Sequence, residues 1–148
     1  MLFLGADHRG FSLKEELKKY LLEQNISFTD LGNLKLIKDD DYPDIAAQVA
    51  QQVSKDKKNK GILICGSGIG VCIVANKFKN VRAGLFWNSK VTTAATADDN
   101  VNIACLPSDY LKKLEAQKII TTWLKTPLKK DGKYMRRLKK IYKLERNF

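Results

Sequence analysis

The sequence predicts an α/β fold, in which one domain spanning residues 1–148 forms an open, doubly wound, Rossmann-like sheet of five parallel strands. Short apolar runs rich in branched residues recur along the chain, and each is followed by a turn signal and a helical pattern. The 44% apolar content over this length is enough for one core. Crossovers in such sheets are right-handed, and ligands bind beyond the carboxyl ends of the strands.

The first quarter of the chain contains two predicted strands around one predicted helix. An apolar run over residues 1–6 predicts the first strand. Ser12 and Glu15 then form a capping-box pattern, which predicts the start of an amphipathic helix. The run from Ile26 to Leu31 predicts the second strand, so the chain opens with a βαβ unit.

The third strand, residues 61–65 with the sequence GILIC, is the most hydrophobic and is expected at the centre of the sheet. Before it, the Tyr-Pro pair at 42–43 favours an extended chain ahead of a helix over about 45–53. After it, the GSGIG sequence at 66–70 turns the chain into a helix that ends near Phe78.

The second half repeats the pattern. A fourth strand is expected over Val81–Trp87 and a short helix over Ser89–Ala97. A fifth strand over Asn102–Leu106 precedes a long helix over Ser108–Leu124, which Pro127 ends.

The charge of the chain is concentrated at its C-terminus. The sequence has 27 Lys and Arg against 16 Asp and Glu, a net charge of +11, and residues 125–148 alone carry +8. A basic protein suggests binding to nucleic acid, because phosphate contacts dominate such affinity. The rest of the chain is near neutrality, which argues against a nucleic-acid partner. A role of the tail in RNA or DNA binding remains as an alternative.

Residues 127–148 form a basic C-terminal arm in which a helix is expected over 131–148. Tyr134, Leu138 and Ile141 lie on one side of that helix, and Lys and Arg occupy the other. An apolar stripe needs a surface to cover it. We therefore predict that these three side chains are buried between chains of a homodimer or homotetramer.

Three cysteines, Cys65, Cys72 and Cys105, form neither a disulfide pattern nor a zinc-ligand spacing. They are typical of free thiols in a reducing compartment. The N-terminus lacks the features of a signal peptide, and no window approaches the roughly 20 apolar residues of a membrane span. We therefore expect a cytoplasmic protein that contacts no membrane and needs no metal.

The GSGIG sequence places small residues at a helix N-terminus, where free N–H groups attract phosphate, carboxylate or an oxyanion. Val71 stands where a dinucleotide-binding fingerprint would have its third glycine, and the lysine of a P-loop is missing. Cys65 directly precedes this loop, where such N–H groups favour a thiolate that can act as a base or nucleophile. The alternatives are glycines that only allow tight packing and a cysteine that is a small core residue.

Asp7, His8 and Arg9 follow the first strand between two glycines, and His8 is the single histidine of the chain. His8 and Arg9 could hold a phosphate, while Asp7 could accept hydrogen bonds from sugar hydroxyls. The alternative is a capped surface turn. Three such residues together at the carboxyl end of a strand favour the binding site.

Taken together, GADHRG, DLG with DYPD, GILICGSGIG followed by ANK, VRAGL and DGKYMRR resemble the family of ribose-5-phosphate isomerase B and galactose-6-phosphate isomerase. The resemblance spans nearly the whole chain. It implies an aldose–ketose isomerase of a phosphorylated sugar, most simply ribose 5-phosphate, with no cofactor and with sites shared between subunits. It also implies that Cys65 moves a proton through a cis-enediolate, with Ser67 as a hydroxyl partner.

Three positions depart from the family pattern. Asp98 stands where the family has the histidine that opens the furanose ring, and could serve as a weaker acid or base. Asp109 replaces a phosphate-binding arginine, and Lys133 replaces another. Arg9 could compensate for the lost cation. These departures leave open an alternative, a non-catalytic relative or one that binds a six-carbon sugar phosphate.

The candidate residues fall into two groups. The catalytic candidates are Cys65, Ser67 and Asp98. The candidates for substrate binding are Asp7, His8, Arg9, Tyr42, Gly66, Gly68, Ile69, Gly70, Asp99, Lys133 and Arg137.

Overall fold

A computed structural model describes residues 1–145 and contains one sheet of five parallel strands, as the sequence predicts. The strands are β1 (Leu2–Ala6), β2 (Thr29–Asp30), β3 (Lys60–Cys65), β4 (Ala83–Leu85) and β5 (Ile103–Pro107). Their order across the sheet is β2-β1-β3-β5-β4, so the apolar β3 is central. The carboxyl ends of β1, β3 and β5 therefore meet at one edge, where the candidate loops emerge.

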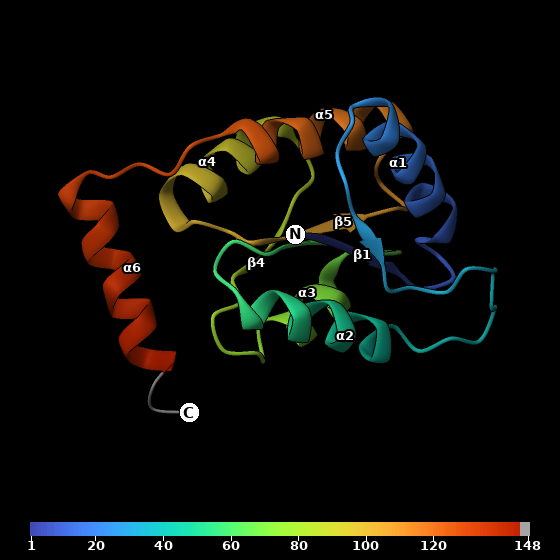
Figure 1. Cartoon of the computed structure of the whole chain (residues 1–148), viewed down its shortest axis with the longest axis horizontal. Helices are drawn as coiled ribbons and strands as arrows, with labels where there is room; N and C mark the ends of the chain where they lie inside the picture. Colours follow the sequence, from blue (N-terminus) through green and yellow to red (C-terminus); the bar gives the residue numbers. More distant parts are fainter. Residues whose placement is uncertain (146–148) are drawn as a thin grey trace.

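Helices cover both faces of this sheet. They are α1 (Phe11–Glu23), α2 (Tyr42–Lys55), α3 (Ile69–Ala75), α4 (Ser89–Asp99), α5 (Lys113–Lys125) and α6 (Gly132–Glu145). Figure 1 shows α1, α4 and α5 over one face and α2 with α3 over the other, while α6 stands at the end of the molecule beside α4. The result is a three-layer α/β fold.

The two faces of β3 supply the two halves of the core. Ile62 and Ile64 pack in the layer with α1 and α5, whereas Leu63 and Cys65 pack in the layer with α2 and α3. This alternation follows from the two-residue period of a strand, and both sides are apolar because both are covered.

Three predicted helix starts are wrong, those of α1, α2 and α5. The helix α1 begins one residue before Ser12, with Gly10 at the N-cap, and its cap lacks a side-chain hydrogen bond. The Gly10 carbonyl accepts from the Lys14 amide at 2.9 Å, which places Ser12 inside the first turn and excludes a capping box there. The helix α2 begins at Tyr42, because Pro43 is tolerated in a first turn where its missing N–H costs nothing.

The two outermost strands of the sheet are shorter than predicted, with two residues in β2 and three in β4. The helix α5 starts at Lys113, five residues after the predicted start at Ser108. The amides of Ser108 and Asp109 instead donate to the carbonyls of Cys65 and Gly66, at 3.0 and 3.1 Å. The chain after β5 is therefore tied to the loop after β3.

The helix α6 confirms the predicted amphipathic helix over its described residues; residues 146–148 of that prediction lie outside them. Leu138 is only 2% exposed within its own chain, whereas Tyr134 and Ile141 are half-buried. Burial of Leu138 thus needs no second subunit, which corrects that part of the prediction. Packing of this helix on a neighbouring chain stays a prediction. Among residues 1–145, the helices are too short or too polar to cross a membrane.

Candidate active site

The loop after β3 surrounds the sulfur of Cys65. Cys65 is 5% exposed, and the Gly68 amide donates to its Sγ at 3.1 Å. The Ile69 amide donates to the Ser67 hydroxyl oxygen at 3.3 Å. The Gly68 N–H is therefore directed at the sulfur that would accept a proton. These two amides already have partners within the loop.

Gly68 has to be glycine for this geometry. Its φ is +72°, and a Cβ there would lie 2.5 Å from a methyl group of Leu85 and 3.0 Å from the backbone between Leu106 and Pro107. Both the left-handed conformation and the close approach to β5 exclude a side chain. The turn that directs the Gly68 amide at the sulfur therefore depends on this residue.

Residues after β1 border the same loop. Asp7 is buried and accepts a hydrogen bond from the Gly10 amide at 2.9 Å, which fixes the turn. The guanidinium of Arg9 lies over Gly66, since a Cβ on Gly66 would be 2.6 Å from its Cζ. The turn after β1 and the loop after β3 thus form one surface at the carboxyl edge.

Asp109, which replaces the family's arginine, forms an ion pair with Arg9. The Ser108 hydroxyl adds hydrogen bonds to the carbonyls of Arg9 and Cys65, both at 3.1 Å. The carboxylate that would repel a phosphate is thus neutralised by a neighbouring cation. The charges of Arg9 and Asp109 sum to zero, so this pair adds no net charge beside the loop.

Tyr42 closes the other side of the loop. It is the first residue of α2, and a Cβ on Gly70 would lie 2.7 Å from its ring. The structure therefore brings together, around Cys65, most of the residues that the sequence singled out. They are Asp7, His8, Arg9, Tyr42, Ser67 and the loop residues Gly66, Gly68, Ile69 and Gly70.

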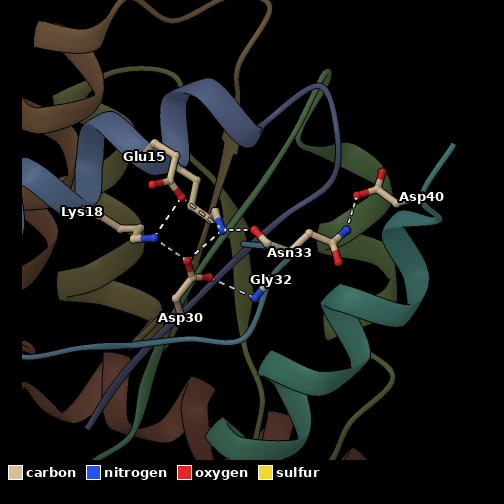
Figure 2. Close-up of polar contacts among 7 residues, drawn as sticks. Glu15, Lys18, Asp30, Gly32, Asn33 and Asp40 are labelled. Atoms are coloured by element: carbon tan, nitrogen blue, oxygen red, sulfur yellow. Dashed lines mark hydrogen bonds and ion pairs between the residues drawn. The ribbon is translucent and has the colours of Figure 1, made fainter. Parts of the chain in front are cut away.

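A polar network that no sequence pattern above predicts includes Asp30, Asn33 and Asp40 (Figure 2). Lys14 is completely buried, and its Nζ donates to a carboxylate oxygen of Asp30 and to the Asn33 carbonyl, each at 2.7 Å. The Asn33 side chain donates to Asp40 at 2.8 Å, and Asp40 in turn contacts His8. One signal was available: Lys14 lies three residues before Leu17, on the buried side of its helix.

Four candidates lie elsewhere. Asp98 and Asp99 end α4, which leads into the amino end of β5, and Lys133 and Arg137 are on α6. Cys65 pairs with Pro107 at the other end of β5, four residue steps or about 13 Å from the start of that strand. A single chain therefore does not unite these four with the cysteine loop.

The local partners of this second group are on the arm. Asp98 pairs with Lys129 at 2.8 Å, and this hydrogen bond raises the pKa of Lys129. The rings and cations of the arm also cluster, with the charged ends of Lys133 and Arg137 lying 5.0 and 5.9 Å from the centre of the Tyr134 ring.

The other two cysteines are embedded in the layer of α2 and α3. Cys105 is fully buried in β5, and this burial raises the pKa of its thiol well above the usual value. Cys72 is half-buried and donates to the Ala83 carbonyl at 3.4 Å. Both environments favour a structural role.

A family model described as "Ribose/Galactose Isomerase" matches residues 2–141. The chain belongs to this ribose/galactose isomerase family. It is 39% identical to a probable ribose-5-phosphate isomerase B of Mycoplasma genitalium, over 98% of this chain and 95% of that protein.

Solved members of the ribose/galactose isomerase family have the same fold. A crystal structure of ribose-5-phosphate isomerase B from Mycoplasma genitalium with bound ribulose-5-phosphate matches with a TM-score of 0.94 and 38% identity, over 99% of this chain and 97% of that one. Ribose-5-phosphate isomerase B from Clostridium thermocellum matches with a TM-score of 0.92 and 32% identity, over 99% and 97%. The departures at Asp98 and Asp109 therefore occur on an intact family fold.

Proposed function

We propose that this protein is an aldose–ketose isomerase that interconverts ribose 5-phosphate and ribulose 5-phosphate. The observation that carries the proposal is the position of the Cys65 sulfur. It accepts a hydrogen bond from the Gly68 amide and lies beside the Asp7–Arg9 turn. The family relatives at 38–39% identity, named for this activity or solved with ribulose-5-phosphate, support it.

The reaction moves one proton between C2 and C1 of the open-chain sugar. The Cys65 thiolate accepts the proton from C2 of the aldose, which leaves a cis-enediolate, and the resulting thiol returns a proton to C1. A proton also passes from the oxygen on C2 to the oxygen on C1, and in this proposal the Ser67 hydroxyl donates a hydrogen bond to these oxygens. Asp7 accepts hydrogen bonds from sugar hydroxyls, and the Tyr42 ring covers the loop at Gly70.

Phosphate binding and ring opening involve a second copy of the chain in this proposal. Lys133 and Arg137 carry the positive charge that a phosphate dianion requires, yet they lie on α6, which packs against α4 ahead of the amino end of β5. A homodimer that brings α6 and the end of α4 of one protomer to the cysteine loop of the other completes the site. Asp98 then acts as the acid or base that opens the furanose ring, and Asp99 contacts the sugar.

A non-catalytic or six-carbon-specific protein is the less favoured alternative, because the named relatives are ribose-5-phosphate isomerases and the cysteine loop is intact. Turnover of ribose 5-phosphate and of six-carbon aldose phosphates distinguishes the two. We expect ribose 5-phosphate to be converted, with kcat in Cys65→Ala reduced about 10³-fold by loss of the base.

Cys72→Ala is the matched control, because it removes a thiol from the same layer and leaves the loop intact; we expect turnover close to that of the wild type. Full activity in Cys65→Ala, or conversion of only six-carbon substrates by the wild type, would contradict the proposal.

A further inference from the structure

We propose that Asp40 is a positioning residue that holds the His8 imidazole through Nδ1 and presents Nε2 to the substrate. The presentation of Nε2 rests on the proposed isomerase function, whereas the contact itself does not. His8 is the single histidine of the chain. The orientation and charge of this one imidazole therefore matter for any acid chemistry or phosphate contact at the carboxyl edge.

One oxygen of Asp40 holds His8 twice. Asp40 Oδ1 accepts from the His8 amide and from the ring Nδ1, both at 2.8 Å. Two hydrogen bonds to one carboxylate oxygen fix the backbone and the ring together, so the ring cannot turn without breaking one of them. Within residues 1–145 His8 Nε2 makes no hydrogen bond, which leaves it as the ring nitrogen for a ligand.

Asp40 is itself fixed from behind. Its side chain is 9% exposed, and its second oxygen accepts from the Asn33 amide group at 2.8 Å. The Asn33 carbonyl is bound by the buried Lys14 ammonium. Figure 2 shows Asn33 between Asp40 and the Asp30 cluster, so the connection from β2 to α2 is tied down at both ends. Such support behind a side chain that contacts the substrate is how a site is preorganised.

The charges around His8 favour its protonated form. The hydrogen bond that the His8 ring donates to Asp40 is the largest cause that raises the pKa of His8. Desolvation of the ring lowers this pKa, and the nearby Asp7 carboxylate adds to the rise. Arg9 is adjacent, but it pairs with Asp109. For Asp40, partial burial alone would raise the pKa, yet the hydrogen bonds from His8 and Asn33 outweigh it and the net pKa is lowered.

The sign of the resulting pH dependence follows from these shifts. Because the folded His8 has a raised pKa, the His8–Asp40 pair stabilises the fold fully below the ordinary histidine pKa, and this stabilisation is lost as the pH rises through the raised value. At neutral pH the imidazolium fraction is increased, and both ring nitrogens are then donors. Nε2–H can donate to a phosphate or sugar oxygen.

Nuclear magnetic resonance of the full chain tests the contact directly, because a single histidine gives unambiguous ring signals. We expect a His8 pKa above the usual value and, once the ring is neutral, a proton on Nδ1. In Asp40→Asn the pKa should shift downward. The control Asp39→Asn makes the same change in charge at an exposed neighbour on the same loop and should leave the His8 titration as in the wild type.

Equal titrations in all three proteins, or a neutral wild-type ring protonated on Nε2, would overturn the proposal. The wild-type tautomer needs no variant, so the question is decided even if Asp40→Asn fails to fold.

Kinetics with ribose 5-phosphate test the presentation of Nε2. The alkaline limb of kcat/KM in Asp40→Asn should move to lower pH by the same amount as the His8 titration, while Asp39→Asn keeps the wild-type profile. A shifted titration with an unshifted profile would overturn the presentation of Nε2 to the substrate. A wild-type protein without turnover would instead refute the proposed function. The magnetic resonance titration would then still decide whether Asp40 holds the His8 ring.

Discussion

The two edges of the sheet hold their charged residues in different ways. At the carboxyl edge, His8, Asp40 and the buried Lys14 are joined in a continuous series of contacts. At the amino edge, Asp98 and Lys129 form a surface pair in which the side chains keep 30% and 46% of their exposure. The first arrangement is preorganised by one chain, whereas the second leaves its charges in water. This difference supports the proposal that the carboxyl edge forms the core of the site and that the amino edge contributes only when a second protomer covers it.

The physical basis of the contrast is solvation. A buried ion such as Lys14 must be hydrogen-bonded, because leaving its charge unpaired lowers the free energy of unfolding by roughly several kcal/mol. An exposed pair is screened and contributes about 0–1 kcal/mol. Removal of single charges should therefore separate the two edges by their effect on stability.

The largest expected effect is at Lys14. In Lys14→Met the buried Asp30 keeps two partners, Lys18 at 2.8 Å and the Gly32 amide at 3.0 Å, so we expect a loss of unfolding free energy of about 3 kcal/mol, near the lower end for a broken buried pair. Denaturant unfolding measures it. Lys19→Met is the control, because Lys19 is an exposed residue of the same helix whose change should stay within about 0.5 kcal/mol. Equal losses in the two variants would show that the network does not stabilise the fold.

Gly68→Ala should have the next largest effect. The positive φ and the contact with the backbone of β5 predict a loss of about 2 kcal/mol. Displacement of the amide that faces Cys65 should also lower kcat about 10²-fold. Gly132→Ala makes the same substitution at the start of α6, where a Cβ would meet no atom within 4 Å, and should change stability by less than about 0.5 kcal/mol. A fully stable and active Gly68→Ala would contradict the assigned geometry.

Asp98→Asn should have the smallest effect on stability, below about 1 kcal/mol, because it removes only an exposed pair. If a second protomer uses this carboxylate for ring opening, kcat for ribose 5-phosphate should fall about 10²-fold while Tm stays close to the wild type. Asp56→Asn, an exposed carboxylate after α2, is the control for charge. Wild-type kcat in Asp98→Asn would exclude Asp98 from the reaction and leave the amino edge without a catalytic residue.

Much of the fold and part of the site could be predicted from local sequence patterns. GILIC followed by GSGIG encodes a buried strand, a tight turn and the helix α3 within residues 61–75, so neighbours along the chain determine the Cys65 loop. The Asp7–Arg9 turn could likewise be predicted, because its three polar side chains are consecutive in the sequence. The capping box at Ser12 failed because Gly10 started the helix earlier through its backbone carbonyl.

The sequence by itself determined the parallel α/β sheet, the cysteine loop and the basic amphipathic arm, because each is encoded by the period or adjacency of residues. Only the tertiary structure decided that Arg9 neutralises Asp109, that Asp40 holds His8, and that Asp98 and Lys133 lie away from Cys65. These are contacts between residues distant along the chain. Their geometry depends on which strand ends meet at an edge and on which ions are removed from water, and neither property has a local sequence signal.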